Sequence, residues 1–318
     1  MGIGCMDWAY MLKLGTNMWC DVVPPRWANY AVDELHYKGA SDHLRCDDAL
    51  WREVTDRARA AGFNMLLIDL GEGIQYPSHP ELWVKGSWSP DKLRAELARL
   101  RGIGLEPVPK LNFSTSHDTW LGEYGRMVST PEYYRVCADL VRDVVELFGQ
   151  PRLFHLGYDE ESAGQQSYYA YAVVRQGELW WHDLLWFVKT VESTGVRPWM
   201  WSDACRKHWD EFEKRMPRSV MQSNWYYGDF STSNAATDSY EKLDKAGFDQ
   251  MPTGSNWAKE ENFSLTVKHC RDKVSPERLK GFVMAPWRHT VPHFRQSLIS
   301  AVDIAACAIG GNASLRGG

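Results

Sequence analysis

Short apolar segments alternate with longer amphipathic segments along the whole 318-residue chain. Eight apolar segments have the length and composition of buried strands. They span residues 12–19, 63–71, 105–113, 152–159, 197–203, 220–227, 248–257 and 281–289. Helical periodicity is found between them, at 47–61, 90–101, 131–148, 178–194, 209–216, 233–246, 261–274 with 276–279, and 292–309.

Eight strand and helix units with right-handed crossovers close naturally into a (β/α)8 barrel. The sequence therefore predicts a single (β/α)8 catalytic domain over residues 1–318. Glycines at the ends of several helical segments fit helix C-caps. They are Gly62, Gly102, Gly149, Gly195, Gly247 and Gly310. A doubly wound open sheet is the alternative, but it requires a glycine-rich phosphate loop after a strand, and Gly71-Glu-Gly73 lacks the third glycine.

The charge and the apolar runs of the chain exclude two classes of partner. The net charge is −5, and the 36 Lys and Arg residues do not cluster, so we expect neither nucleic acid nor an anionic membrane as partner. No apolar run approaches the roughly 20 residues of a membrane span. Residues 1–10 include Asp7 and lack the basic start and apolar core of an export signal.

The cysteines favour a reducing compartment. There are seven, an odd number, at Cys5, Cys20, Cys46, Cys137, Cys205, Cys270 and Cys307, and no two form a C-x-x-C pair. Neither a disulfide framework nor a zinc site is therefore expected. The sequence favours a cytoplasmic location mildly and leaves the compartment and the oligomeric state otherwise open.

The fourth strand segment ends in a cluster of carboxylates, in Arg152-Leu-Phe-His-Leu-Gly-Tyr-Asp-Glu-Glu161. Side chains alternate along an extended chain, so His155, Gly157 and Asp159 share one face, and Gly157 leaves room there. Asp159 and Glu160 are adjacent, so both can face one ligand only where the strand ends and the backbone turns. Two acids in different environments suit an acid and a stabiliser; a solvated turn is the alternative.

Tryptophans gather at the same ends of the predicted strands. Trp19, Trp201, Trp225, Trp257 and Trp287 lie at or near these ends, out of 16 Trp in the chain. Flat apolar rings with an N–H donor match the C–H face of a pyranose, whereas single indoles also serve to fill barrel layers. Five together favour a carbohydrate ligand.

Further motifs on neighbouring strands extend this pattern. They are Asn64 to Leu82 on the second strand and its loop, Val108 to His117 on the third, Tyr227-Gly-Asp229 after the sixth, and Trp201 and Trp287. With His155-Leu-Gly-Tyr-Asp-Glu160, they resemble the barrel of glycoside hydrolase family 20, the β-N-acetylhexosaminidases, whose fourth strand ends in His-x-Gly-Gly-Asp-Glu. Tyr158 replaces the second glycine of that motif.

The resemblance implies a retaining exo-hydrolase that removes terminal β-linked N-acetylhexosamine from a glycan or glycoside. The 2-acetamido oxygen of the substrate attacks the anomeric carbon, which gives an oxazolinium intermediate. Glu160 is then the general acid and base, with a pKa raised by apolar surroundings. Asp159 orients the acetamido group, Tyr227 donates to its oxygen, and Asp229 binds a sugar hydroxyl. No cofactor is implied.

Three histidines are further candidates for the site. His155 is expected to support the acids from behind, and His117 to contact substrate or support Glu160. His289 stands where the family has a Glu that grips hydroxyls, and the family Arg after strand one is missing. Arg26 and Arg288 are candidates to replace these contacts. Asp69 and Glu72 are weaker candidates for lining the pocket.

Other interpretations stay open at this point. A glycosidase of a different sugar would use Asp159 or another carboxylate, such as Asp203, as a direct nucleophile. A barrel that binds carbohydrate without catalysis would keep the tryptophans alone. Metal binding is not expected, because Pro292 interrupts any helix between His289 and His293.

Overall fold

A computed structural model describes residues 6–310 of the chain. Eight parallel strands form one sheet. They are β1 (Asp7–Lys13), β2 (Met65–Asp69), β3 (Glu106–Lys110), β4 (Leu153–His155), β5 (Arg197–Trp201), β6 (Met221–Ser223), β7 (Thr253–Gly254) and β8 (Gly281–Met284). The sheet order is β6-β5-β4-β3-β2-β1-β8-β7. Single bridges from Gln222 to Gln250 and from Trp225 to Thr253 link its two edges, so the sheet closes and the predicted (β/α)8 barrel is confirmed.

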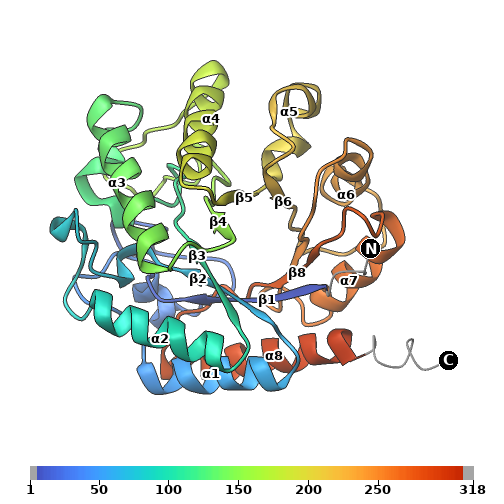
Figure 1. Ribbon diagram of the computed structural model, residues 1–318, viewed down its shortest axis with the longest axis horizontal. Coiled ribbons are helices and arrows are strands. Elements are labelled where there is room, and N and C mark those ends of the chain that lie inside the picture. Colours follow the sequence, from blue (N-terminus) through green and yellow to red (C-terminus); the bar gives the residue numbers. More distant parts are fainter. Residues whose placement is uncertain (1–5, 311–318) are drawn as a thin grey trace.

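Eight helices form a ring around the strands in chain order (Figure 1). They are α1 (Asp48–Ala60), α2 (Pro90–Gly102), α3 (Pro131–Leu147), α4 (Gly177–Ser193), α5 (Trp209–Arg215), α6 (Ala235–Lys245), α7 (Asn262–Lys273) and α8 (Arg295–Gly310). Asp47, Ser89 and Thr130 accept a backbone N–H at the starts of the first three, as N-cap side chains do. The glycine predicted to cap α2 is its last residue; Gly104, with φ 87°, takes the left-handed conformation instead.

The barrel interior is apolar at one level and charged at the next. Apolar side chains fill the lower level, from Ala9, Met11, Met65, Leu67, Val108, Leu153, Trp199, Met221 and Val283. One level nearer the carboxyl ends, Lys13 pairs in register with Asp69, and Asp69 with Lys110. Both ammonium groups lie 2.8 Å from the Asp69 carboxylate. This buried ion triad forms the floor beneath the loops.

The first strand lies earlier in the chain than the sequence predicted. The expected strand covered residues 12–19, but β1 ends at Lys13. Beyond it, the N–H groups of Leu14 and Gly15 both bond to the carbonyl of Asp69, so the chain leaves the sheet. The predicted segment began too late in the apolar run from Trp8 to Leu14, in which the buried Lys13 is the one charged residue. Trp19 therefore lies in a loop.

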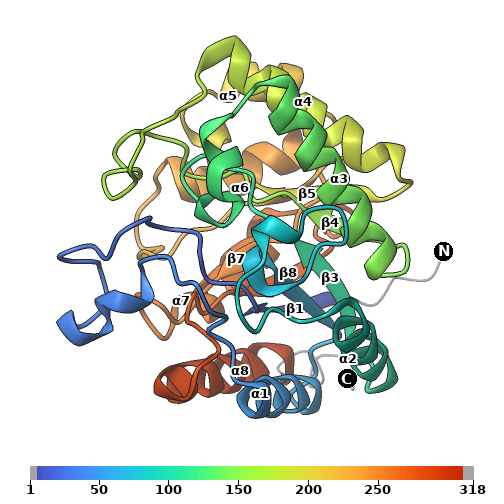
Figure 2. The ribbon, with the colours of Figure 1, turned by 90° about the vertical axis from the view of Figure 1, so that its left-hand side faces the viewer.

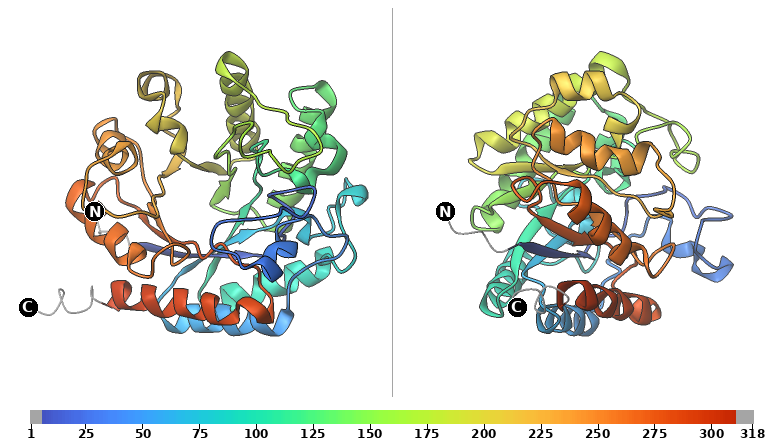
Figure 3. Two further views of the ribbon diagram at one scale, coloured as in Figure 1. Left: turned by 180° about the vertical axis from the view of Figure 1, so that it is seen from behind. Right: turned by 90° about the vertical axis from the view of Figure 1, so that its right-hand side faces the viewer.

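The loops at the carboxyl ends of the strands build one face of the molecule. Figures 2 and 3 show the loop between β1 and α1, residues 14–47, extending outward beyond this end of the barrel. It contacts the loop after β4, since the N–H of Asp21 bonds to the carbonyl of Tyr168 and the hydroxyl of Tyr169 to that of Met18. The longest loop thus follows β1, whereas the sequence emphasised those after strands two, three and four.

Two chain-wide expectations can be checked over residues 6–310. None of the helices there is long and apolar enough to cross a membrane. The six cysteines of this part have free thiols. Cys5, and with it the first half of the segment compared with export signals, lies outside the described residues.

Candidate active site

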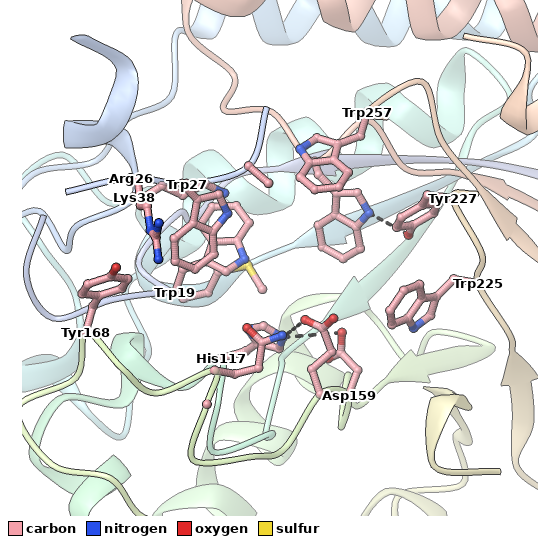
Figure 4. A pocket seen from close by; sticks show the side chains of 16 residues that line it. Trp19, Arg26, Trp27, Lys38, His117, Asp159, Tyr168, Trp225, Tyr227 and Trp257 are labelled. Carbon is pink, nitrogen blue, oxygen red and sulfur yellow. Dashed lines mark hydrogen bonds and ion pairs between the residues drawn. The ribbon is translucent and has the colours of Figure 1, made fainter. Parts of the chain in front are cut away.

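A cavity of about 660 Å³ opens at the carboxyl ends of the strands. Seven of its sixteen lining residues are Trp or Tyr, and two are acids (Figure 4). It is lined by Met18, Trp19, Arg26, Trp27, Ala28, Lys38, His117, Asp159, Glu160, Gly164, Gln165, Tyr168, Trp225, Tyr227, Trp257 and Trp287. The two carboxylates come from the segment after β4 that the sequence singled out.

The backbone turns sharply between β4 and the acids. The strand ends at His155, and positive φ angles follow at Gly157 (67°), Tyr158 (72°) and Glu160 (54°). Left-handed conformations at non-glycine residues carry strain and are found often at functional sites. This turn brings Asp159 and Glu160 to one cavity, as their adjacency required.

Asn112 holds this turn in place and occupies the space that Gly157 leaves. A Cβ at Gly157 would lie 2.1 Å from Asn112 Oδ1. That oxygen accepts the N–H groups of Tyr158 and Ser114, each at 3.0 Å, and Asn112 Nδ2 donates to Asp159 Oδ1 at 2.9 Å. The gap predicted from the sequence thus holds a side chain of β3's loop, which fixes the Asp159 carboxylate.

His117 lies between the two acids. Its Nε2 is 3.4 Å from Glu160 Oε2 and 3.6 Å from Asp159 Oδ2. Asp159 and His117 are buried, and about a third of the Glu160 side chain is exposed in the cavity (33%). The outermost of the three groups is therefore the Glu160 carboxylate.

These contacts separate the pKa values of the two acids. Burial and the charge of Glu160 raise the pKa of Asp159, although His117 opposes this. Burial alone would raise the pKa of Glu160, but the hydrogen bond and charge of His117 hold it below its ordinary value. Burial alone would lower the pKa of His117, but Asp159 and Glu160 outweigh it and raise this pKa above its ordinary value. The expected rise in the pKa of Glu160 is thus wrong for the free protein. Apolar surroundings alone would destabilise the charged carboxylate, but the neighbouring His117 stabilises it.

A third carboxylate stands behind the acids. Asp203 Oδ2 accepts the N–H of Glu160 at 3.1 Å, and burial together with the charge of Asp159 raises the pKa of Asp203 to about 6. Asp203 lines a second cavity of about 630 Å³, which shares Glu160, Gln165 and Trp225 with the first. It does not line the cavity that holds Asp159.

Aromatic side chains from β6, β7 and β8 form the opposite wall. Trp287 Nε1 donates to the hydroxyl of Tyr227 at 2.8 Å, which leaves the hydroxyl proton of Tyr227 free to reach a ligand. Trp225 stacks on Tyr227 at a centroid distance of 5.3 Å, and Trp257 meets it edge-on at 6.4 Å. The structure therefore brings Tyr227 and four of the five predicted tryptophans, Trp19 included, to one cavity.

Four predicted site residues do not line the cavity. Trp201 and His155 are buried beneath it, with ring centroids 4.2 Å apart, and Gly157 N–H donates to His155 Nδ1. His289 is buried against Trp19. Asp229 is exposed, and its carboxylate accepts the N–H of Ser231 within its own turn.

The two weaker candidates at the end of β2 have structural contacts. Asp69 belongs to the ion triad, and Glu72 accepts the N–H groups of Thr16 and Asn17. Sequence reasoning missed Trp27, Lys38, Tyr168 and Asn112. The first three lie on irregular loops, where no periodicity marks a position; Asn112, directly after strand three, carried the only signal, a buried polar residue at a strand end.

His117, Asp159 and Glu160 also form a group that could coordinate a metal ion. Their ligating atoms lie within 4.8 Å of one another. The sequence gave no such indication, because the three residues come from two loops and have no motif spacing. His289 and His293, the pair considered from the sequence, both contact Tyr37, but His289 is buried whereas His293 is exposed and bonds to Glu34.

The fold is similar to that of known glycosidases. One solved structure that matches is a β-N-acetylhexosaminidase from Bacteroides fragilis NCTC 9343, with a TM-score of 0.62 and 12% sequence identity over 93% of this chain and 65% of that one. A chitobiase from Flavobacterium johnsoniae matches with a TM-score of 0.62 and 16% identity over 84% of this chain and 46% of that one. Dispersin B matches with a TM-score of 0.58 and 14% identity over 95% of this chain and 99% of that one. The chain shares their barrel fold. It spans less than two thirds of the length of the first two. No protein-family model and no curated protein matches the sequence.

Proposed function

We propose that the protein is a retaining glycoside hydrolase that removes terminal β-linked N-acetylhexosamine by substrate assistance. The arrangement of carboxylates supports this most directly. The cavity wall contains two, Asp159 and Glu160, and both come from the segment that follows β4. A direct nucleophile and an acid flank the sugar from different directions, so here the nucleophile is supplied by the 2-acetamido group of the substrate.

Glu160 is the residue that transfers the proton. Its side chain is the more exposed of the two acids, so its oxygen reaches the leaving group. Protonated, it donates to the glycosidic oxygen; ionised, it then takes a proton from the water that opens the oxazolinium ring. A bound sugar displaces water from the cavity, which favours the protonated acid.

Asp159 and Tyr227 act on the acetamido group. Asp159, held by Asn112, accepts the acetamido N–H and balances the developing positive charge. The free hydroxyl proton of Tyr227 points the acetamido oxygen toward the anomeric carbon. The tryptophans stack on the sugar ring. The structural neighbours include a β-N-acetylhexosaminidase and a chitobiase, which agrees with this substrate class.

The separation of the acids does not decide between mechanisms by itself. Their oxygens lie within 4.8 Å of each other, close to the ~5 Å of a direct retaining pair. The adjacency of Asp159 and Glu160, which share His117, favours substrate assistance, because a direct nucleophile and an acid flank the sugar from different directions. Asp203, the other candidate nucleophile, lies outside this cavity.

The substitution Glu160→Gln tests the proposal. We expect turnover to fall by roughly 10²–10⁴-fold for substrates with poor leaving groups and much less for activated aryl glycosides, which need little protonation. Glu123→Gln, at an exposed position, is the matched control. An equal loss on both substrate types would remove Glu160 as the acid.

A further inference from the structure

A buried lysine faces the cavity from the loop after β1. Lys38 follows the 3-10 helix η1 (Val32–Tyr37), and only 2% of the residue is exposed. Three aromatic rings surround its ammonium group, which lies 3.2 Å from the centroid of Trp19, 4.2 Å from Tyr30 and 5.0 Å from Trp27. Lys38, Trp19 and Trp27 all line the cavity. Figure 4 shows them on the side away from Trp225 and Tyr227.

The ammonium group of Lys38 has no protein counter-ion. Within residues 6–310, its Nζ makes neither a hydrogen bond nor an ion pair; the only hydrogen bond from Lys38 is that of its backbone N–H to Leu35. Cation–π attraction offsets only part of the desolvation of a charge. Burial, with the charges of Lys13 and Arg288, lowers the pKa of Lys38 well below its ordinary value, although the charge of Glu160 opposes this. An anion beside it would restore the charged form.

Other cations nearby are also without partners. Arg288 lies 4.4 Å from the Tyr30 ring, and its buried Nε and Nη1 atoms have no hydrogen-bond partner among the described residues. Arg26 lines the cavity and makes no ion pair with any described residue. Glu34 and Asp42, the two carboxylates closest in the chain, are bonded to His293 and His43. The loop after β1 thus brings two cations, Lys38 and Arg26, to this side of the cavity.

We propose that this end of the cavity binds an anionic substituent of the terminal sugar, with Lys38 as the specificity-determining contact. The inference rests on the proposed function for the placement of the sugar, whose anomeric carbon lies at Glu160. A cavity of about 660 Å³ has room for a monosaccharide with a substituent at its far end. Sulfate, phosphate and carboxylate share the required chemistry, and the experiment distinguishes them.

Binding of free monosaccharides tests the inference without requiring turnover. N-acetylglucosamine, its 3-sulfate, 6-sulfate and 6-phosphate, and glucuronic acid are titrated by calorimetry and by tryptophan fluorescence. We expect at least one anionic sugar to bind about 10- to 100-fold more tightly than its neutral parent, as a charged hydrogen bond in a desolvated site provides. Added NaCl should weaken that preference. Equal affinity for neutral and anionic sugars would overturn the inference.

Variants assign the preference to Lys38. Lys38→Met keeps the length of the side chain and should remove the preference for the anionic sugar over its neutral parent. Lys38→Arg should retain part of the preference for the anionic sugar. Lys268→Met, a control at an exposed position on α7, should retain all of that preference. A preference that survives Lys38→Met, with its fold confirmed by circular dichroism, contradicts the assignment; the wild-type titration decides if that variant does not fold.

Hydrolysis separates this inference from the proposed function. Turnover of a neutral aryl N-acetylglucosaminide with no charge preference in binding would keep the function and reject the anion site. Charge-selective binding without turnover of any 2-acetamido glycoside would keep the anion site and reject the proposed function. Turnover of an aryl β-glucuronide alone would keep the anion site and replace the proposed sugar.

Discussion

Replacing Asp203 by asparagine should make the protein more stable at neutral pH. The Oδ1 atom of Asp203 is buried without a partner, and Oδ2 accepts the N–H of Glu160. Burial and the charge of Asp159 raise the pKa of Asp203 from 3.8 to about 6. Such a rise corresponds to about 3 kcal/mol by which folding disfavours the charged carboxylate. Asparagine removes the charge and keeps an oxygen for the Glu160 N–H.

The effect has a defined pH dependence. The folded state holds the Asp203 proton up to about pH 6, whereas the unfolded state releases it near pH 4. The free energy of unfolding of the wild type therefore decreases as pH rises from 4 to 6, and the loss is complete above that range. Asp203→Asn lacks this loss. We expect a gain of about 1–3 kcal/mol at pH 7.5, reduced by the lost attraction to Arg206, and almost none at pH 4.

Denaturant unfolding of both proteins at the two pH values measures this difference. Asp272→Asn, exposed on α7, is the control and should change neither value. A destabilised Asp203→Asn protein at pH 7.5 would refute the reasoning, because the charge would then be favourable. The same variant should keep turnover within about tenfold; a loss of 10³-fold or more would favour Asp203 as a direct nucleophile.

Two further substitutions test the geometry around the acids. His117→Asn should move the alkaline limb of the kcat/KM profile to higher pH, since His117 holds the pKa of Glu160 down and the protonated acid is the active form; an unmoved limb would contradict this, and His43→Asn, exposed, is the control. Gly157→Ala should destabilise the protein by about 2–5 kcal/mol and abolish turnover, because the new Cβ meets Asn112 Oδ1 at 2.1 Å in a left-handed backbone. Gly164→Ala, whose Cβ would lie 3.9 Å from its nearest neighbour, should change little; equal unfolding midpoints for both glycine variants would count against the turn geometry.

The helices and the barrel could be predicted from local patterns. Amphipathic periodicity and capping residues such as Asp47 and Ser89 act within a few positions of the chain, so helix ends were predicted within about two residues. The first strand was predicted too late in the chain, and nothing in the segment itself indicates that Lys13 is buried. Its burial depends on Asp69 and Lys110 from two other strands, and such partners cannot be read from the segment itself.

The same division holds for the candidate site. Asp159, Glu160, Tyr227 and Trp287 follow strand ends, so closure of the barrel brings them together. Lys38 lies on a loop whose path is fixed by distant contacts, and no local pattern predicts its position. Asp229 was predicted from its motif, but the direction of its side chain could not be predicted. That direction depends on the turn after β6, in which the Asp229 carboxylate accepts the N–H of Ser231.

Substrate assistance is tested most directly by two aryl β-glycosides that differ only in the 2-acetamido group. If this group is the nucleophile, the aryl N-acetyl-β-glucosaminide is hydrolysed and the matched β-glucoside is not, because no carboxylate faces the acids across the cavity lined by the described residues. We expect kcat/KM for the N-acetyl-β-glucosaminide to be at least about 10³ times that for the β-glucoside. Comparable turnover of the two substrates would contradict it and favour a direct carboxylate nucleophile.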